Sequence, residues 1–409
     1  MFLQNMTRLI ILILLWLMLA ACQNTPTPTP PPTSGIVTAP PIEDALVTTI
    51  PTPVDEAIII EADAEHLLLT NIYARVNPSV VNIEAAIDQG GINTVQYGSG
   101  FIYDRNGHIV TNAHLVNQAD DIRVTFYDGY VIDAELVAQD DYSDIAVLYV
   151  NAPIPRLQPV TLGDSDTVQV GDRAIVIGNP WGLNGSMTTG IISGIGRQLN
   201  SVELLNSSLI PSFQNPHIIQ IDASLPPGNS GAPLLNSQGQ TIGITTALTA
   251  DDNTLLGVGF GIPSNTIQRV VPALITRGEV DYSWLGINTV RSNSGVIAFS
   301  EALGLPVNSG VLITGITPDS PAEAAGLRGG TAIQVVRDVP ICAGGDIILA
   351  INDYYVQNMD DLTYYLVVNT RPGDVVTLRV VRDGQPFDVP VTLASRPTSG
   401  ALIPACGEE

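Results

Sequence analysis

The chain has 409 residues, which is enough for two or three domains, and its apolar content is ordinary for proteins with a real core. It carries 16 Lys and Arg against 40 Asp and Glu, a net charge of -24. This balance argues against nucleic-acid binding, which needs a basic face, and acidic charge mostly serves solubility.

The N-terminus is typical of an export signal. Arg8 precedes an apolar run from Leu9 to Ala21 that is too short to span a bilayer comfortably. The run ends in Leu19-Ala-Ala-Cys22, which resembles the lipobox of bacterial lipoproteins. That resemblance implies a signal peptide at residues 1–22, a lipidated Cys22 and a membrane-anchored protein outside the cytoplasm. The alternative is ordinary signal cleavage, with Cys22 as a bystander.

A tether is expected next, at residues 23–60. The stretch from Thr25 to Pro53 is rich in Thr and Pro and almost free of charge. Such a composition cannot form a core and favours an extended, polyproline-like chain. We expect the tether to hold the folded part away from the membrane.

The first folded domain is expected at residues 61–278. It opens with an amphipathic helix over Glu61–Arg75, and Asn77-Pro78 ends it. The apolar residues expected on one face of this helix are Leu67, Leu68, Ile72 and Val76. β-rich runs separated by turn pairs follow, and a helix after Pro263, with Ser264 as its N-cap, closes the domain. The predicted strands are Val80–Ala85, Ser99–Tyr103, His108–Asn112, Ile122–Tyr127, Val131–Val137 and Ile145–Val150, then Arg173–Ile177, Met187–Ile195, Ile218–Ile221, Ala232–Leu235, Gln240–Thr246 and Val258–Ile262.

Two sets of about six strands with no helices between them predict two closed antiparallel barrels in tandem, a mainly β fold. A cleft between two such barrels is a place where substrate sites tend to form.

A candidate nucleophile lies in the second set. Ser230 stands between Gly228 and Gly231 on a predicted tight turn. Glycine allows the backbone to gather successive N–H groups into a concavity suited to an oxyanion. On its own, Gly-Asn-Ser-Gly is equally good chemistry for a plain turn.

Two further residue types complete a catalytic constellation. A serine hydrolase needs an imidazole to accept the hydroxyl proton and a carboxylate to orient that imidazole. His114 follows the third predicted strand, and Asp144 directly precedes the sixth. The order His–Asp–Ser is that of chymotrypsin-type barrels, whereas subtilisin and the α/β-hydrolases have other orders. Ala232 stands where an α/β-hydrolase elbow has its second glycine.

Other residues of these types are assigned no catalytic part. Asp140 and Asp141 are near enough to Asp144 to be confused with it, but a buried carboxylate at a strand start favours Asp144. The remaining histidines, expected at surface or strand positions, are His66, His108 and His217.

Together these motifs resemble the HtrA (DegP/DegS-like) family of trypsin-fold serine proteases. The resemblance runs in family order over roughly Glu65 to Arg277. It rests on Ile72–Val80, Tyr97-Gly-Ser-Gly-Phe-Ile102, Thr111-Asn-Ala-His-Leu-Val116, Ser143-Asp-Ile-Ala-Val-Leu148, Ile177-Gly-Asn-Pro-Trp-Gly182, Gly228-Asn-Ser-Gly231 and Gly259-Phe-Gly-Ile-Pro-Ser264.

The resemblance implies roles for these residues. His114 would be the general base, Asp144 its orienting carboxylate and Ser230 the nucleophile. The backbone N–H groups of Gly228 and Ser230 would form the oxyanion hole, and Gly231 would pack behind the serine. It implies no metal and no cofactor, and a homotrimer built through N-terminal segments of the protease domain.

The chain departs from the family around the nucleophile. Pro226-Pro227 stands where the family usually has Asn-Pro, and Ala232 replaces a frequent second glycine. Two prolines fix two φ angles, so an inactive-to-active rearrangement of this loop would behave differently. The expected primary pocket, Ser224–Pro227 with Gly243–Ala247, holds no acidic residue, so Lys and Arg are not the expected preference. The family implies small or medium apolar residues such as Val or Ala.

A second domain is expected at residues 279–395. Tyr282-Ser-Trp-Leu-Gly-Ile287 resembles the carboxylate-binding loop of a PDZ domain, the usual companion in this family. Successive N–H groups at Leu285, Gly286 and Ile287 would capture a peptide C-terminus while the peptide adds as a strand. The alternative is a domain that binds nothing.

The remaining cysteines lie in two extra pieces of this domain. Cys342 lies in an insertion between Arg328 and Gly344, and Cys406 lies in a tail at residues 396–409. Outside the cytoplasm such a pair favours a disulfide, and two free thiols are the alternative.

The sequence thus predicts a lipid-anchored, ATP-independent serine endopeptidase outside the cytoplasm that cleaves misfolded or exposed polypeptides. The expected partners are unfolded proteins, peptide C-termini and the membrane, with no nucleic acid. The main rival is a chaperone or adaptor that holds peptides without cutting them, and a small-molecule esterase is a third possibility.

Overall fold

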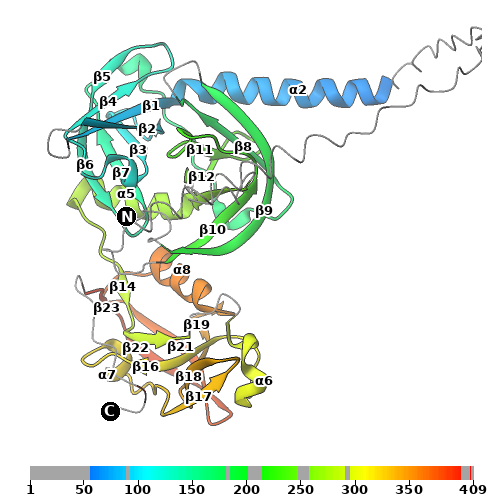
Figure 1. The fold of residues 1–409 in the computed structure, drawn as a ribbon, viewed down its shortest axis with the longest axis vertical. Helices are drawn as coiled ribbons and strands as arrows, with labels where there is room; N and C mark the ends of the chain where they lie inside the picture. Colours follow the sequence, from blue (N-terminus) through cyan, green and yellow to red (C-terminus); the bar gives the residue numbers. More distant parts are fainter. Residues whose placement is uncertain are drawn as a thin grey trace, which may run out of the picture. The chain divides into compact units, whose positions relative to one another are not determined.

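The computed structural model describes residues 56–88, 93–180, 185–200, 214–246, 258–290, 295–397 and 406. Cys22 and the predicted signal peptide lie outside these residues. Helix α2, Glu56–Val76, confirms the predicted first helix (Figure 1). Its last turns bury Ile72 and Val76 beside Ile175 and Leu235 of the second strand set. Leu67, which we expected on the same face, is instead 66% exposed. Among the described residues, we find no helix with both the length and the apolar character that membrane crossing requires.

The first strand set forms a seven-stranded antiparallel sheet in the order β5-β4-β1-β2-β3-β7-β6. The path of hydrogen bonds between its described strands starts at β5 and ends at β6, so this half is not the fully closed barrel we expected. The strands are β1 (Val80–Asp88), β2 (Asn93–Ile102), β3 (His108–Thr111), β4 (Asp121–Thr125), β5 (Val131–Asp133), β6 (Glu135–Asp140) and β7 (Ile145–Tyr149), with the short helix α3 (Ala113–Val116) after β3.

One predicted strand of this set is two. The sequence predicts a continuous strand over Val131–Val137, but the chain changes partner at Ala134. Before Ala134 the chain pairs with β4, and after it the chain pairs with β7. The Ala134 N–H itself donates to the Ile122 carbonyl over 2.8 Å. The β-propensity of the residues cannot reveal such a change of partner, because the chain is extended on both sides of Ala134.

The second strand set closes into a barrel in the order β10-β13-β12-β11-β8-β9, as expected (Figure 1). A mainly β, trypsin-like fold is confirmed by these two halves. The barrel strands are β8 (Arg173–Gly178), β9 (Ser186–Asn200), β10 (Gln214–Asp222), β11 (Pro233–Leu235), β12 (Thr241–Thr246) and β13 (Val258–Pro263).

Helix α5, Ser264–Arg277, follows the barrel and ends at Gly278, which has a left-handed φ of 77°. The prediction of Ser264 as its N-cap is wrong. Pro263 occupies the cap position, and the Ser264 hydroxyl instead donates to the Gly163 carbonyl over 2.8 Å. A long-range acceptor therefore takes the hydroxyl that a local cap would have used.

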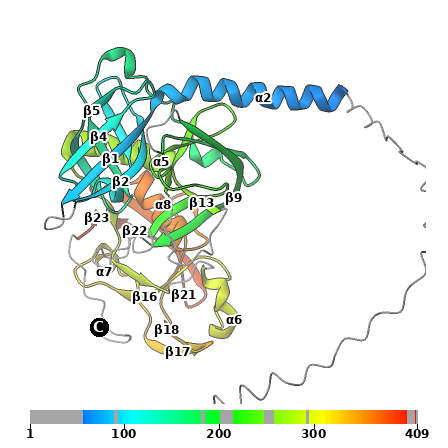
Figure 2. The same ribbon diagram turned by 45° about the horizontal axis from the view of Figure 1, so that its top comes forward.

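The second domain is built on a sheet in the order β15-β16-β19-β21-β22, with α6, α7 and α8 as its α-helices (Figure 2). This arrangement confirms the expected second domain. The elements are β14 (Ser283–Trp284), β15 (Ile287–Thr289), α6 (Ser300–Leu303), β16 (Val311–Ile316), α7 (Pro321–Ala324), β19 (Ile347–Ile351), β20 (Tyr354–Tyr355), α8 (Met359–Asn369), β21 (Val375–Arg382), β22 (Gln385–Thr392) and β23 (Ala394–Ser395).

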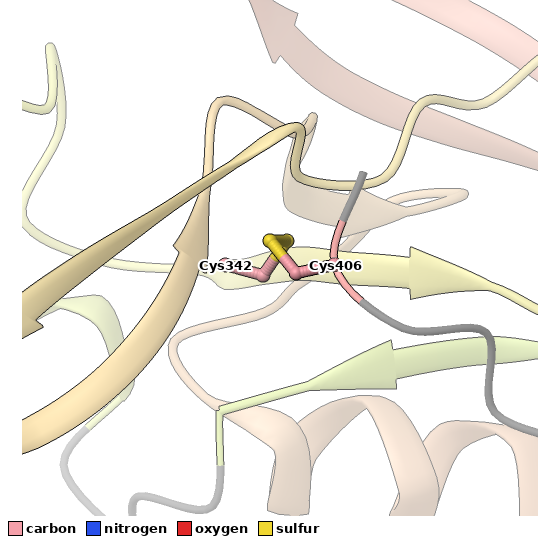
Figure 3. The surroundings of a disulfide bond; sticks show 2 residues. All are labelled: Cys342 and Cys406. Carbon is pink, nitrogen blue, oxygen red and sulfur yellow. A yellow bond between two sulfur atoms is a disulfide. The ribbon is translucent and has the colours of Figure 1, made fainter. Parts of the chain in front are cut away.

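The insertion in this domain folds as a hairpin of β17 (Ala332–Val336) and β18 (Val339–Ala343). Cys342 of β18 forms a disulfide with Cys406 across 64 residues of sequence (Figure 3). The bond joins the insertion to the tail. On one side of the hairpin Ile341 is buried beside Leu312 of β16.

We predict that this bond stabilises the PDZ domain through the loop it closes. On the chain-entropy argument, closing a loop of this length is worth about 4 kcal/mol. Replacing both cysteines, Cys342→Ser with Cys406→Ser, should lower the domain's free energy of unfolding by up to that amount, measured by urea denaturation. Intact mass is the control: oxidised protein should weigh two hydrogens less than reduced protein, and equal masses would contradict the bond.

Candidate active site

His114 and Asp144 are in direct contact. Both carboxylate oxygens of Asp144 lie 2.9 Å from Nδ1 of His114, and the backbone N–H of His114 donates to Oδ1 over 3.0 Å. The Asp144 carboxylate is almost fully buried, whereas a fifth of the His114 side chain is exposed. The carboxylate therefore fixes one ring nitrogen of an imidazole that solvent can still reach.

The backbone of Asp144 is also fixed. Asp144 has a left-handed φ of 54°, which residues other than glycine seldom adopt. Its carbonyl accepts hydrogen bonds from the Asn112 side chain over 3.1 Å and from the Ala113 N–H over 3.2 Å. The short helix α3 that carries His114 therefore begins on Asp144 itself, so both residues are positioned by one set of contacts.

The electrostatics of the pair favour a protonated imidazole. Burial opposes the imidazolium and lowers the pKa of His114, but the charge of Asp144 and its hydrogen bond outweigh that effect. The net result is a His114 pKa above its ordinary value. Such a ring accepts a proton readily, which a general base requires.

Ser230 lies against β2, the strand that pairs with β3, and β3 leads into His114. Its carbonyl accepts the Ser99 N–H over 2.8 Å, and the Thr111 hydroxyl donates to the Ser99 carbonyl over 2.8 Å. Next to it, Gly231 has a φ of 85°, and a Cβ there would collide with the Ser99 carbonyl. The absence of a side chain at Gly231 therefore allows the Ser230 turn to approach the first strand set.

The turn before Ser230 is held by a residue to which the sequence assigned no role. Gly228 has a φ of 93°, and its carbonyl accepts the Ser99 hydroxyl over 2.7 Å. The Ser99 hydroxyl in turn accepts the Asn179 N–H over 2.9 Å. Asn229 closes the turn by donating its N–H to the Pro226 carbonyl over 3.2 Å. These bonds fix the conformation of Gly228 and Asn229, the two residues that precede the candidate nucleophile.

Each of the other candidates has a different partner. Asp140 accepts from Ser143, and Asp141 accepts from Gln139. His108 contacts Asp104, at 2.7 Å from its Nδ1. Thr246 of the closed barrel, which the sequence places only in the expected primary pocket, has its hydroxyl 3.4 Å from Asp144 Oδ2.

His66 and His217 also lie away from the pair. His66 accepts the Thr70 hydroxyl at its carbonyl. The ring of His217 stacks on Tyr364, with ring centroids 3.9 Å apart. Its Nε2 is 3.3 Å from the Asp361 carboxylate.

Known proteins match both domains. Residues 98–244 match the trypsin-like peptidase domain, and residues 283–393 match the PDZ domain. Protease Do-like 1 of Arabidopsis thaliana chloroplasts is 36% identical over 366 residues, covering 88% of this chain and 77% of that protein. The chain belongs to the HtrA family of serine proteases.

Other HtrA relatives give the same assignment. A probable periplasmic serine endoprotease, DegP-like, of Chlamydia trachomatis serovar D is 37% identical over 75% of this chain and 55% of that protein. The periplasmic pH-dependent serine endoprotease DegQ of Escherichia coli is 35% identical over 74% of this chain and 60% of that protein. The chain therefore spans little more than half the length of these bacterial relatives.

Solved HtrA structures share the fold. The HtrA-type protease AlgW with a tripeptide superposes with a TM-score of 0.61 at 31% identity, covering 81% of this chain and 98% of that one. The serine endoprotease from Yersinia pestis has a TM-score of 0.53 at 29% identity, over 80% of this chain and 98% of that one.

The HtrA chain also carries its predicted PDZ loop on an ordered turn. Gly286 has a φ of 81°, and its carbonyl accepts the Thr317 N–H over 2.8 Å. The Leu285 carbonyl accepts the Ala322 N–H over the same distance. Ile287 is the first residue of β15, which pairs with β16 and is an edge strand of the described sheet.

We predict that Asp144→Asn lowers the pKa of His114, because the neutral amide no longer stabilises the imidazolium. A raised His pKa contributes stability that is fully present below the unfolded-state pKa and is lost as pH rises through the folded-state pKa. The variant should therefore lose stability mainly on the acid side of that range. Proton NMR of the imidazole ring measures the pKa, with His66 as the internal control, and an unmoved His114 would contradict the assignment.

Proposed function

We propose that this HtrA chain is a serine endopeptidase in which His114, Asp144 and Ser230 form the catalytic triad. The contact of both Asp144 oxygens with His114 Nδ1 carries the proposal, because it directs Nδ1–H to the carboxylate and leaves the other ring nitrogen for the nucleophile. His114 accepts the Ser230 proton as the hydroxyl attacks a peptide carbonyl. It then returns the proton to the leaving amine, and water repeats the sequence on the acyl-enzyme.

The N–H groups of Gly228 and Ser230 are proposed to stabilise the oxyanion. Two constraints support this: the left-handed φ of Gly228 and the Ser99 hydroxyl bound to its carbonyl. A Cβ on Gly228 would lie 2.6 Å from the Pro180 Cβ, so only glycine fits this turn without displacement. Donors fixed before the reaction need no reorganisation when charge develops.

Substrates are proposed to be misfolded or exposed polypeptides. The PDZ domain would bind a peptide C-terminus at the N–H groups of Leu285, Gly286 and Ile287, while the peptide adds to the edge of β15. Support comes from the edge position of β15 and the ordered turn at Gly286. The AlgW proteases solved with a decapeptide and with a tripeptide share this fold.

The setting is proposed to be outside the cytoplasm. Relatives named as periplasmic endoproteases support this, as do the paired cysteines. Anchoring through a lipidated Cys22, with residues 23–60 as tether, and assembly as a homotrimer are part of the same proposal. These last features rest on the N-terminal sequence and on the family resemblance.

We predict that a fluorophosphonate labels the wild-type protein at Ser230 and that Ser230→Ala abolishes both labelling and casein cleavage. The substitution removes the only group that forms the acyl bond. Intact mass measures labelling, and gel assay measures cleavage. Ser237→Ala, in a turn outside the site, is the matched control and should change neither.

A wild-type protein that binds unfolded casein but is neither labelled nor cleaves it would favour the rival function, a peptide-holding chaperone or adaptor. Turnover of small esters without casein cleavage would favour an esterase.

The primary pocket generates a further prediction. Its proposed segments carry no carboxylate, and Leu225 packs over Gly259, where a Cβ would lie 2.6 Å from the leucine Cδ1. An apolar pocket favours small aliphatic side chains and cannot stabilise a cation. Peptides with Val or Ala before the cleaved bond should therefore have kcat/KM values at least about tenfold above matched Lys peptides. Faster cleavage after Lys would refute the pocket assignment.

A further inference from the structure

A chain of hydrogen bonds leads from the start of the PDZ domain to the loop that presents Asp144. The Tyr282 hydroxyl donates to Oδ2 of Asp140 over 2.5 Å. The backbone N–H and the hydroxyl of Ser143 donate to the same oxygen over 3.0 and 2.5 Å. Ser143 directly precedes Asp144 in the chain. Asp140 therefore closes the loop on itself, and Tyr282 holds the closing carboxylate from outside.

These contacts are buried, which makes them consequential. Asp140 is 7% exposed and Tyr282 is 5% exposed. A carboxylate out of water depends on its donors, and removing one of them leaves it less well stabilised in a region of low dielectric. Tyr282 also shares a hydrophobic cluster with Val110 of β3 and Ile145 of β7, the strands that flank His114 and Asp144.

Both ends of the PDZ domain meet at this point. Tyr282 directly precedes β14, and β14 pairs with the final strand β23. The N–H of Arg396, one residue after β23, donates to the Tyr282 carbonyl over 2.9 Å. Its guanidinium lies over the ring of Tyr142, 4.8 Å from the centroid, and Tyr142 meets Tyr282 edge-on. The catalytic loop is therefore packed against both the entry and the exit of the second domain.

The backbone conformation of Asp144 depends on the contacts around it. Its left-handed backbone is a conformation that persists only when the surroundings hold it. Contacts with Asn112 and Ala113 hold the carbonyl side of the residue. The Asp140–Ser143 contact holds the preceding residue, and that contact is the one that Tyr282 reaches.

We propose that Tyr282 is a positioning residue for the catalytic carboxylate: through Asp140 and Ser143 it fixes Asp144 against His114. The activity of the protease domain then depends on the contact that the start of the PDZ domain makes with Asp140. This inference rests on the proposed function, because it concerns the geometry of the proposed triad.

The test is the full-length variant Tyr282→Phe, which removes the hydroxyl and keeps the ring in the core. We expect kcat for a peptide substrate to fall about tenfold with KM unchanged, as the loss of one buried bond to a charged group would produce. The acid limb of the kcat/KM profile should move to lower pH, because a less well-placed Asp144 stabilises the His114 imidazolium less. A purely structural role would not move that limb.

The matched control is Tyr355→Phe, a tyrosine of the PDZ domain that is 74% exposed. It should leave kcat, KM and the pH profile at wild-type values. Asp140→Asn should cause a loss as large as Tyr282→Phe or larger, and the double variant should lose no more than Asp140→Asn alone, because both act through one path. If Tyr282→Phe unfolds at the assay temperature, Asp140→Asn, which keeps an acceptor, takes its place with the same expected split.

A folded Tyr282→Phe with wild-type kcat and an unmoved acid limb overturns the positioning role. Fully additive losses in the double variant also overturn it. A wild-type protein inert toward both casein and fluorophosphonate would instead refute the protease function, so the two failures are distinguishable.

Discussion

The Asp144 carboxylate and the backbone that carries it are the constraint on which the site depends. Asp144 has a left-handed φ, its carbonyl receives two hydrogen bonds from the start of α3, and its side chain receives two bonds from His114. Each contact alone is modest, with a net contribution of about 1–3 kcal/mol. Together they tie the position of the imidazole to the conformation of one loop.

The nucleophile is held to this arrangement by a second set of bonds. Ser99 donates its N–H to the Ser230 carbonyl and its hydroxyl to the Gly228 carbonyl. It also accepts the Asn179 N–H, so one residue of the first sheet orders two segments of the closed barrel. Conversely, the Thr246 hydroxyl of the closed barrel lies beside the Asp144 carboxylate, which belongs to the first strand set. The two halves of the protease domain thus each supply supports for residues of the other.

The second domain is attached through buried polar contacts rather than through a bare linker. Tyr282 belongs to the core of the protease domain while it begins the PDZ domain. The same PDZ domain has an insertion that departs from the family pattern, the hairpin of β17 and β18. A disulfide joins Cys342 of this hairpin to Cys406 of the tail. The start of the PDZ domain is thus hydrogen-bonded to the loop that carries Asp144, and its inserted hairpin is disulfide-bonded to the C-terminal tail.

The sequence by itself determined most of the protease-domain strands, the order of the two domains and the residue types of the site. Strand periodicity, turn pairs and local motifs are properties of neighbouring residues, so they can be read along the chain. Only the tertiary structure decided which distant residues hydrogen-bond to the segments that carry the site. Ser99 and Gly228 are separated by 129 residues, and Tyr282 and Asp140 by 142, so no local pattern records that they bond. The same reason explains Ser264 and Ala134: which acceptor takes a hydroxyl, or which strand takes a partner, depends on what folding brings alongside.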